Sequence, residues 1–278
     1  MAEGPFELRL EIGRARILVG DSITYFAGLQ PDDVIVCGSH GGKTAALFGA
    51  ASGAKALILN DAGTGKDGAG ISGLAAVEPF GVAAATVGYL SARIGSGADT
   101  WESGVISRCN RLAGIAGVAA GMPAAEAASV LASWQAPMRR GRPPTPGDRL
   151  PRTIAEGPPR AVALDSASMV DERCVGVIVV TGSHGGATGG RAVRAAVAAA
   201  FFNDAGVGKD GAGISRLPML DEMGIPGGTA GCETARIGDG WDTYESGVLS
   251  HVNETAHLLG IEPGMSVREA VAMLTRAP

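Results

Sequence analysis

The stretch that decides the fold is NDAGTGKDGAGIS at residues 60–72, because it recurs as NDAGVGKDGAGIS at residues 203–215 with 12 of 13 positions identical. Two more blocks recur at nearly the same spacing: GSHGG at 38–42 and 182–186, and ARIGSGADTWESGVIS at 92–107, which returns as ARIGDGWDTYESGVLS at 235–250. The offset is 144 residues for GSHGG and 143 for the others, so one single-residue deletion brings the halves into register. The pattern predicts two copies of one unit in a single chain.

A Pro-rich stretch separates the two copies. Residues 135–160 hold 7 of the 15 prolines, which can continue neither a helix nor a central strand. We therefore predict a first α/β repeat over residues 1–134, a Pro- and Arg-rich connector over 135–160, and a second α/β repeat over 161–278. Because duplicated units commonly re-create an older homodimer contact, we expect a pseudo-twofold axis between the halves.

Composition narrows the class of partner. The 278 residues are 46% hydrophobic with a net charge of −5 and no long run of like charges, which disfavours nucleic acid and a membrane surface. No signal-like start and no apolar span of about 18 residues is present, so a cytoplasmic location is expected. The four cysteines form no CxxC pair, and we predict no metal and no cofactor. A small, anionic molecule is the expected partner, and homo-oligomerisation stays open.

Short apolar runs alternate with Ala-rich segments, a pattern typical of parallel strands that are buried on both faces and joined by helices. The predicted fold is therefore an internally duplicated α/β unit with a parallel sheet. In the first copy the expected strands are Ala15 to Gly20, Val34 to Gly38, Ala56 to Leu59 and Val82 to Val87. The expected helices are Thr44 to Ser52, Ala69 to Glu78, Thr100 to Ala116 and Ala124 to Ser133.

Each expected strand of the first copy is followed directly by a polar or Gly-rich motif. Ligands bind at the carboxyl ends of strands in open parallel sheets, near the point where the strand order reverses. The motifs should therefore meet at one edge of the sheet. They are Asp21-Ser22, Ser39-His40, Asn60-Asp61, and Ser91 with Arg93, and the second copy repeats the pattern with Asp165, Ser183, His184, Asn203, Asp204 and Arg236.

The GSHGG motif combines small residues with a run of backbone N–H groups, which suits an oxyanion, a carboxylate or a phosphate. A tight strand-to-helix turn would explain its glycines but not its imidazole. We therefore predict substrate contacts from Ser39, Gly41, Ser183 and Gly185, and proton transfer by His40 and His184.

The repeated lysine is the most informative residue of the longest motif. The chain has four lysines, and Lys66 and Lys209 occupy equivalent positions. Unlike Arg, a Lys side chain lowers its pKa readily on desolvation, so it can act as a base or a nucleophile. We predict a catalytic role for both, with common ancestry or a structural ion pair to Asp61 or Asp67 as the alternative.

Acidic, amide and guanidinium groups complete the predicted site. A carboxylate beside Lys and His is what proton transfer requires, and we assign this part to Asp61 and Asp204. Arg93 and Arg236 suit a substrate carboxylate because guanidinium forms bidentate pairs, with a salt bridge across the two copies as the alternative. Asn60 and Asn203 are predicted to bind substrate, with a turn-capping role as the alternative. Asp67 has a helix-capping alternative, and the stretch Asp99 to Glu102 is interpreted as a capping pattern.

The segment Gly20-Asp21-Ser22-Ile23, with Asn60-Asp61 downstream, resembles blocks of the SGNH hydrolases, whose serine is the nucleophile. The resemblance covers only these residues. The chain lacks the Asp-x-x-His of that family near its C-terminus, and Leu164 replaces the glycine in the second copy. We do not assign the family on this basis.

Together the motifs predict a cofactor-independent enzyme that acts on a small polar carbonyl or carboxylate compound, an amide or ester among them. Hydrolysis is the expected chemistry, with a lyase or an isomerase as alternatives. The alternative from another class is a binding or regulatory protein that holds a small anionic metabolite without converting it.

Overall fold

The structure is a computed structural model that describes residues 6–136, 141, 143–144 and 150–276. Ten of the 26 residues of the predicted connector lie outside these residues. The chain divides into two compact units: the first comprises Met1–Thr64, Gly68–Asp148 and Gly208–Asp210, and the second comprises Gly65–Asp67, Arg149–Val207 and Gly211–Pro278. Each unit therefore includes a three-residue segment from the opposite half of the sequence.

The first unit is built around a six-stranded mixed sheet in which β2 to β5 are parallel and both edge strands are antiparallel. The α/β class is confirmed, and the expectation of an all-parallel sheet is corrected at its edges. The strands are β1 (Phe6–Ile12), β2 (Ala15–Gly20), β3 (Val34–His40), β4 (Ala56–Asn60), β5 (Ala83–Val87) and β6 (Ile106–Cys109).

Strand order in this sheet follows chain order, since each described strand pairs with the next one in sequence. The expected reversal of strand order is therefore not found among the described strands. The four parallel strands still end on one edge, because parallel neighbours share a direction. That edge carries the polar motifs named above.

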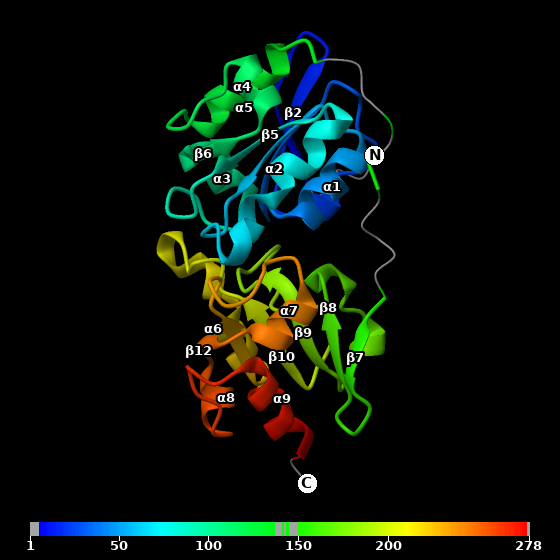
Figure 1. The fold of residues 1–278 in the computed structure, drawn as a ribbon, viewed down its shortest axis with the longest axis vertical. Coiled ribbons are helices and arrows are strands. Elements are labelled where there is room, and N and C mark those ends of the chain that lie inside the picture. Colours follow the sequence, from blue (N-terminus) through cyan, green and yellow to red (C-terminus); the bar gives the residue numbers. More distant parts are fainter. Residues whose placement is uncertain (1–5, 137–140, 142, 145–149, 277–278) are drawn as a thin grey trace. The chain divides into compact units, whose positions relative to one another are not determined.

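Helices cover both faces of the first sheet, as Figure 1 shows. Ile35 and Leu57 point to a core shared with α1 and α2, whereas Val34 and Ile58 point to a core shared with α4 and α5. Alternation of side chains along each strand produces these two cores. The helices are α1 (Lys43–Ser52), α2 (Ser72–Val77), α3 (Gly97–Ser103), α4 (Arg111–Ala116) and α5 (Ala124–Ser133).

The predicted helix from Thr100 to Ala116 is wrong, because β6 interrupts it between α3 and α4. Helix α3 ends before Gly104, where a side chain would lie 2.3 Å from the Thr100 carbonyl oxygen. The chain then passes into β6, and Asn110 starts the next helix by accepting the Ala113 N–H at 3.0 Å. A glycine break and an N-cap thus divide the stretch that was expected to form one helix into three elements.

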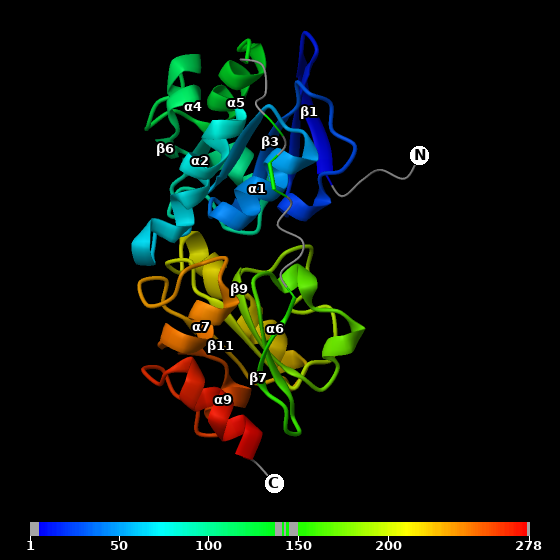
Figure 2. The same ribbon diagram turned by 45° about the vertical axis from the view of Figure 1, so that its right-hand side comes forward.

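The second unit has a sheet of matching strand order, with α7 and α9 on one face and α6 on the other (Figure 2). Its strands are β7 (Arg152–Ala155), β8 (Ala161–Leu164), β9 (Ile178–His184), β10 (Ala199–Asn203), β11 (Gly227–Ala230) and β12 (Leu249–Val252). Its helices are α6 (Arg216–Glu222), α7 (Gly240–Ser246), α8 (Glu254–His257) and α9 (Val267–Arg276). Edge strands β7 and β12 are again antiparallel.

Arg216 marks a difference between the two units. Where the first unit has α1, the chain between β9 and β10 forms no helix. The buried Arg216 guanidinium donates to the carbonyl oxygens of Gly186 and Ala192, each at 2.8 Å. Its counterpart in the first half is Gly73, where a Cβ would lie 2.4 Å from Ala46 on α1. The long side chain thus bonds carbonyl groups of an irregular segment.

Within the described residues, no helix has the length and apolar character needed to cross a membrane. The two sheets of similar order occupy the two sequence halves, as a duplication predicts. The pseudo-twofold relation between the halves stays a prediction.

We expect Gly97→Ala to destabilise the first unit by about 1–3 kcal/mol, because overpacking against backbone forces the chain apart. A Cβ at Gly97 would lie 2.3 Å from the Gly20 carbonyl oxygen. Gly114→Ala is the matched control in α4, where a Cβ meets nothing within 4 Å. It should stabilise by about 0.5–1 kcal/mol. Urea unfolding followed by circular dichroism measures both, and equal effects of the two substitutions would contradict the packing argument.

Candidate functional site

The structure brings the predicted strand-end residues to one edge in each unit. In the first sheet His40 pairs in register with Asn60, and Asn60 pairs with Val87 on the next strand. In the second sheet His184 pairs with Asn203 in the same way. The residues that directly follow these strands, Asp61 among them, therefore share that edge.

Asn60 is fully buried, and its side chain supports the backbone. Its Nδ2 donates to the Ala92 carbonyl oxygen at 3.0 Å, and its Oδ1 accepts the Ala62 N–H at 2.9 Å. Ala62 has a positive φ of 50°, so the amide stabilises an uncommon turn. Asn203 makes the equivalent two bonds with Ala235 and Ala205. Both asparagines thus hold the loop that carries the neighbouring carboxylate.

Asp61 is held by one oxygen only. Its Oδ1 accepts the Tyr89 N–H at 2.9 Å and the Gly63 N–H at 3.3 Å. Among the described residues no hydrogen bond reaches its Oδ2, although the residue is only 6% exposed. A Cβ placed on Gly88 would lie 4.0 Å from this Oδ2 and 3.8 Å from Ser91 Oγ. Asp61 therefore presents an oriented carboxylate oxygen beside a glycine and a serine.

Asp204 has the same arrangement in the second unit. Its Oδ1 accepts the N–H groups of Gly206 and Cys232, each at 2.9 Å. A Cβ on Gly231 would lie 3.9 Å from its Oδ2. The two carboxylates are thus positioned by the same backbone geometry.

The His40 imidazole is buried, and burial lowers its pKa to about 4. Its Nδ1 accepts the Gly42 N–H at 3.1 Å, so the ring proton of the neutral form is on Nε2. His184 Nδ1 accepts the Gly186 N–H at 3.2 Å. His40 is therefore a neutral donor near pH 7.

The backbone N–H groups of the GSHGG loop already have partners in the first unit. Gly41 donates to the Asn60 carbonyl oxygen at 2.6 Å, Gly42 donates to His40, and Lys43 donates to Ser72 Oγ at 3.0 Å. In the second unit the first two of these bonds recur at Gly185 and Gly186, and Ala187 donates to Ser215 Oγ at 2.9 Å. The loop is thus internally bonded.

The serine and first glycine of the loop also have packing roles. Ser39 Oγ accepts the Ile23 N–H at 3.0 Å, and Ser183 Oγ accepts the Ala167 N–H at 2.8 Å. A Cβ on Gly41 would lie 2.7 Å from the Gly70 carbonyl oxygen, and one on Gly185 would lie 2.6 Å from that of Gly213. Close backbone approach accounts for both glycines.

Lys209 belongs to the first unit although it comes from the second half of the sequence. Its Nζ donates to both oxygens of Asp99, at 2.9 and 3.1 Å, and its backbone N–H donates to the Tyr89 carbonyl oxygen at 2.9 Å. The N–H of that same Tyr89 donates to Asp61. One residue therefore connects the lysine segment to the Asp61 carboxylate.

Lys66 has the equivalent contacts in the second unit. Its Nζ donates to both oxygens of Asp242, at 2.9 and 3.1 Å, and its N–H donates to the Cys232 carbonyl oxygen at 2.8 Å. Cys232 donates in turn to Asp204. Lys66 of the first copy thus belongs to the second unit, and Lys209 of the second copy belongs to the first unit. The Asp and His of each copy stay in the unit of their own copy.

The arginines bind the same carboxylates as the lysines. Arg93 donates to Asp99 from its guanidinium at 3.0 Å and from its backbone at 2.6 Å, and it lies 3.8 Å from Asp210. Arg236 bonds Asp242 in the same two ways. Its guanidinium also donates to Asp67, at 2.8 Å from Nε. We call the two sets of bonded residues the strand-end networks. The network of the first unit comprises Asp61, Tyr89, Lys209, Asp99 and Arg93, and that of the second unit comprises Asp204, Cys232, Lys66, Asp242 and Arg236.

Among the network members that bond through their side chains, Asp99 and Asp242 are the ones that sequence reasoning missed as site residues. The helix cap that was expected at Asp99 lies three residues earlier, at Ser96, whose Oγ accepts the Asp99 N–H at 3.1 Å. Burial opposes ionisation of Asp99, but bonds from Arg93 and Lys209 outweigh it and lower its pKa to about 2. The pKa of Asp242 is lowered by the same balance. An acid repeated at one position of both copies was the signal available in the sequence.

No family model, curated protein or solved structure matches this chain in comparisons with known proteins. In the parts of the chain that the structure describes, no three His, Cys, Asp or Glu side chains gather as a metal-binding group. The geometry of the strand-end networks is therefore the basis for assigning a function.

Asp99→Asn should lower the free energy of unfolding by about 2 kcal/mol at pH 6, because the ionised form is favoured in the folded state. A carboxyl with a folded pKa of about 2 stabilises above its unfolded pKa of 3.8, and this contribution is lost as pH falls through 2. Urea unfolding at pH 6 and at pH 2 measures the difference. Glu102→Gln, on the exposed side of α3, is the control. An equal penalty at both pH values contradicts the assignment.

His40 predicts a second pH effect. Because the pKa of His40 is about 4 in the folded protein, below the ordinary 6.5, the unfolded chain binds the proton more readily. The contribution of His40 to the free energy of unfolding is therefore present above pH 6.5, and about 2 kcal/mol of it is lost between pH 7 and pH 5. His40→Asn keeps an acceptor for Gly42 and should remove this slope in urea unfolding. His257→Asn changes an exposed imidazole and should leave the slope intact; the reverse ranking would refute the interpretation.

Proposed function

We propose that the protein is a cofactor-independent hydrolase for a small polar amide or ester that carries a carboxylate, and that it acts at the strand-end networks. Each unit would hold one site, with its lysine supplied by the opposite half of the sequence. A cytoplasmic location and descent of the halves from one duplicated unit are parts of this proposal.

The observation that carries the proposal is the oriented carboxylate of Asp61. Two backbone N–H groups fix its Oδ1, while its Oδ2 accepts no hydrogen bond from the described residues. Asp204 repeats this arrangement. A general base needs a fixed orientation and a lone pair available to the reacting proton, and both carboxylates meet these requirements.

The rest of each network supplies fixed charge. Arg93 is half exposed while its carboxylate partner Asp99 is 5% exposed, so the guanidinium has a surface that can contact a ligand. Lys209 adds a second cation close to Arg93 through the shared Asp99. An anionic group of the substrate would bind there, as Arg and Lys commonly bind carboxylates.

In the proposed reaction Asp61 Oδ2 takes a proton from water as the water oxygen bonds to the substrate's carbonyl carbon. The protonated Asp61 then returns the proton to the leaving nitrogen or oxygen as its bond to that carbon breaks. His40, a neutral donor, would hydrogen-bond the developing oxyanion from Nε2. Lys66 and Lys209 act in this scheme through their charge, since each is bound to a carboxylate.

A specific observation favours a second candidate. The GSHGG N–H groups already have partners and are not available to an oxyanion, and Lys66 and Lys209 each bond both oxygens of a buried carboxylate. The networks would then recognise charge alone, and the protein would bind a small anionic metabolite without converting it.

The test uses Asp61→Asn combined with Asp204→Asn, because Asn keeps the oxygen that accepts the backbone N–H groups. The full-length protein is assayed for acid or ammonia release on short-chain monoesters and monoamides of dicarboxylic acids. We expect turnover to fall by about 100-fold or more, the usual contribution of a general base. Asp171→Asn, which makes the same Asp-to-Asn change once at an exposed side chain, is the control.

Two results would overturn the proposal that the protein is a hydrolase. Full turnover by the double variant excludes Asp61 and Asp204 as the bases. Saturable binding of these compounds by the unmodified protein without any conversion supports the binding protein instead.

A further inference from the structure

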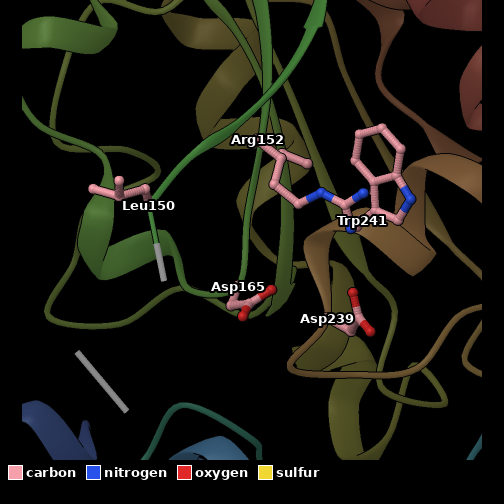
Figure 3. A pocket seen from close by; sticks show the side chains of 6 residues that line it. Leu150, Arg152, Asp165, Asp239 and Trp241 are labelled. Carbon is pink, nitrogen blue, oxygen red and sulfur yellow. The ribbon is translucent and has the colours of Figure 1, made fainter. Parts of the chain in front are cut away.

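A pocket of about 340 Å³ opens in the second unit, and none of its lining residues belongs to the strand-end networks. Figure 3 shows its two carboxyl groups below a stacked arginine and tryptophan. Asp165 directly follows strand β8, and Asp239 and Trp241 flank the first residue of α7. The lining residues are Leu150, Arg152, Ala163, Asp165, Asp239 and Trp241.

Trp241 already binds a cation. The Arg152 guanidinium carbon lies 3.6 Å from the centroid of the indole ring. A planar cation at this distance is attracted by the negative face of the ring. The ring face inside the pocket is therefore suited to a guanidinium or ammonium group.

The lining carries one net negative charge, from two aspartates and one arginine. Asp165 Oδ1 accepts the Gly240 N–H at 3.2 Å, a bond that Asp21 makes to Gly97 at 2.9 Å in the first unit. That bond therefore belongs to the shared fold. If a ligand displaced Arg152 from the ring, the two aspartates would present two negative charges, which the guanidinium and ammonium groups of a dication would neutralise.

Asp239 is not needed as a carboxylate by the helix that it caps. Its Oδ1 accepts the Asp242 N–H at 2.9 Å, and Ser96 makes the equivalent bond in the first unit with a neutral hydroxyl. A serine is thus sufficient for the cap. The additional negative charge of Asp239 lines the pocket, and it also joins Asp67 in raising the pKa of Arg236.

The other recognition groups are also specific to the second unit. The residue equivalent to Trp241 in the first half is Ala98. By sheet register, Glu7 pairs with Val19 where Arg152 pairs with Ala163. An aromatic ring, a second carboxylate and a covering guanidinium therefore coincide around one cavity in the second unit.

We propose that this pocket binds a small organic cation with a guanidinium or ammonium head. The head lies on the face of Trp241 in place of the Arg152 guanidinium, and its N–H groups bond the carboxylates of Asp165 and Asp239. Arg152 covers the ring until the ligand displaces it. The site uses no side chain of the strand-end networks, although Asp239 also accepts the Asp242 N–H.

The experiment titrates full-length protein with agmatine by isothermal calorimetry, with butylurea as the uncharged comparison. Agmatine should bind saturably and butylurea should not. Asp239→Ser, which installs the residue that caps the equivalent helix, should weaken binding by about 10-fold. Trp241→Ala should weaken it by about 5- to 30-fold. Arg152→Met should strengthen it about threefold or more, because it removes the competing cation and keeps an apolar stem.

Asp171→Ser is the matched control, since it removes an exposed carboxylate of the same unit that lies outside the pocket lining. Its affinity for agmatine should equal that of the unmodified protein. The proposal is overturned if agmatine shows no saturable binding, if butylurea binds equally well, or if Asp239→Ser leaves the affinity unchanged. Weaker binding of agmatine after Arg152→Met would contradict the displacement of the Arg152 side chain by the ligand.

Discussion

The burial of Asp99 and Asp242 is the constraint on which the strand-end networks depend. A buried carboxylate is costly unless cations and N–H groups surround it, and each of these accepts bonds from an arginine guanidinium, an arginine backbone and a lysine. Meeting that demand fixes the arginine loop and the lysine segment together. The charge arrangement at the strand ends therefore follows from satisfying one buried group in each unit.

Close backbone approach sets the second constraint. Gly38 and Gly97 allow α3 and the loop before it to lie against the ends of β3 and β2, where a Cβ would come within 2.4 Å of backbone atoms. Helix α3 carries Asp99, so this contact positions the carboxylate. Many glycines in this chain thus serve packing, and the GSHGG loop is an example in which polar and small residues support the turn itself.

The sequence predicted β2 to β5 well because strands buried on both faces read as short apolar runs. Strand β1 was missed because most of its residues are exposed, and β6 because it is only four residues long. The Lys209–Asp99 and Lys66–Asp242 pairs join residues 110 and 176 positions apart. Spacing within one motif carries no information about such partners, so the lysines were grouped with their own copy.

A comparison of the two units distinguishes the residues that both halves share from those found in one half only. The shared part, from Asn60 to Arg93 and from Asn203 to Arg236, places a carboxylate and two cations by the same backbone bonds. The pocket at Trp241 differs, since the first half has Ala98 and Ser96 where the second has an indole and a carboxylate. A repeat can keep one scaffold in both halves while a few side chains create a new binding surface in one of them. Function in this fold is therefore best sought both in the shared networks and where the halves diverge.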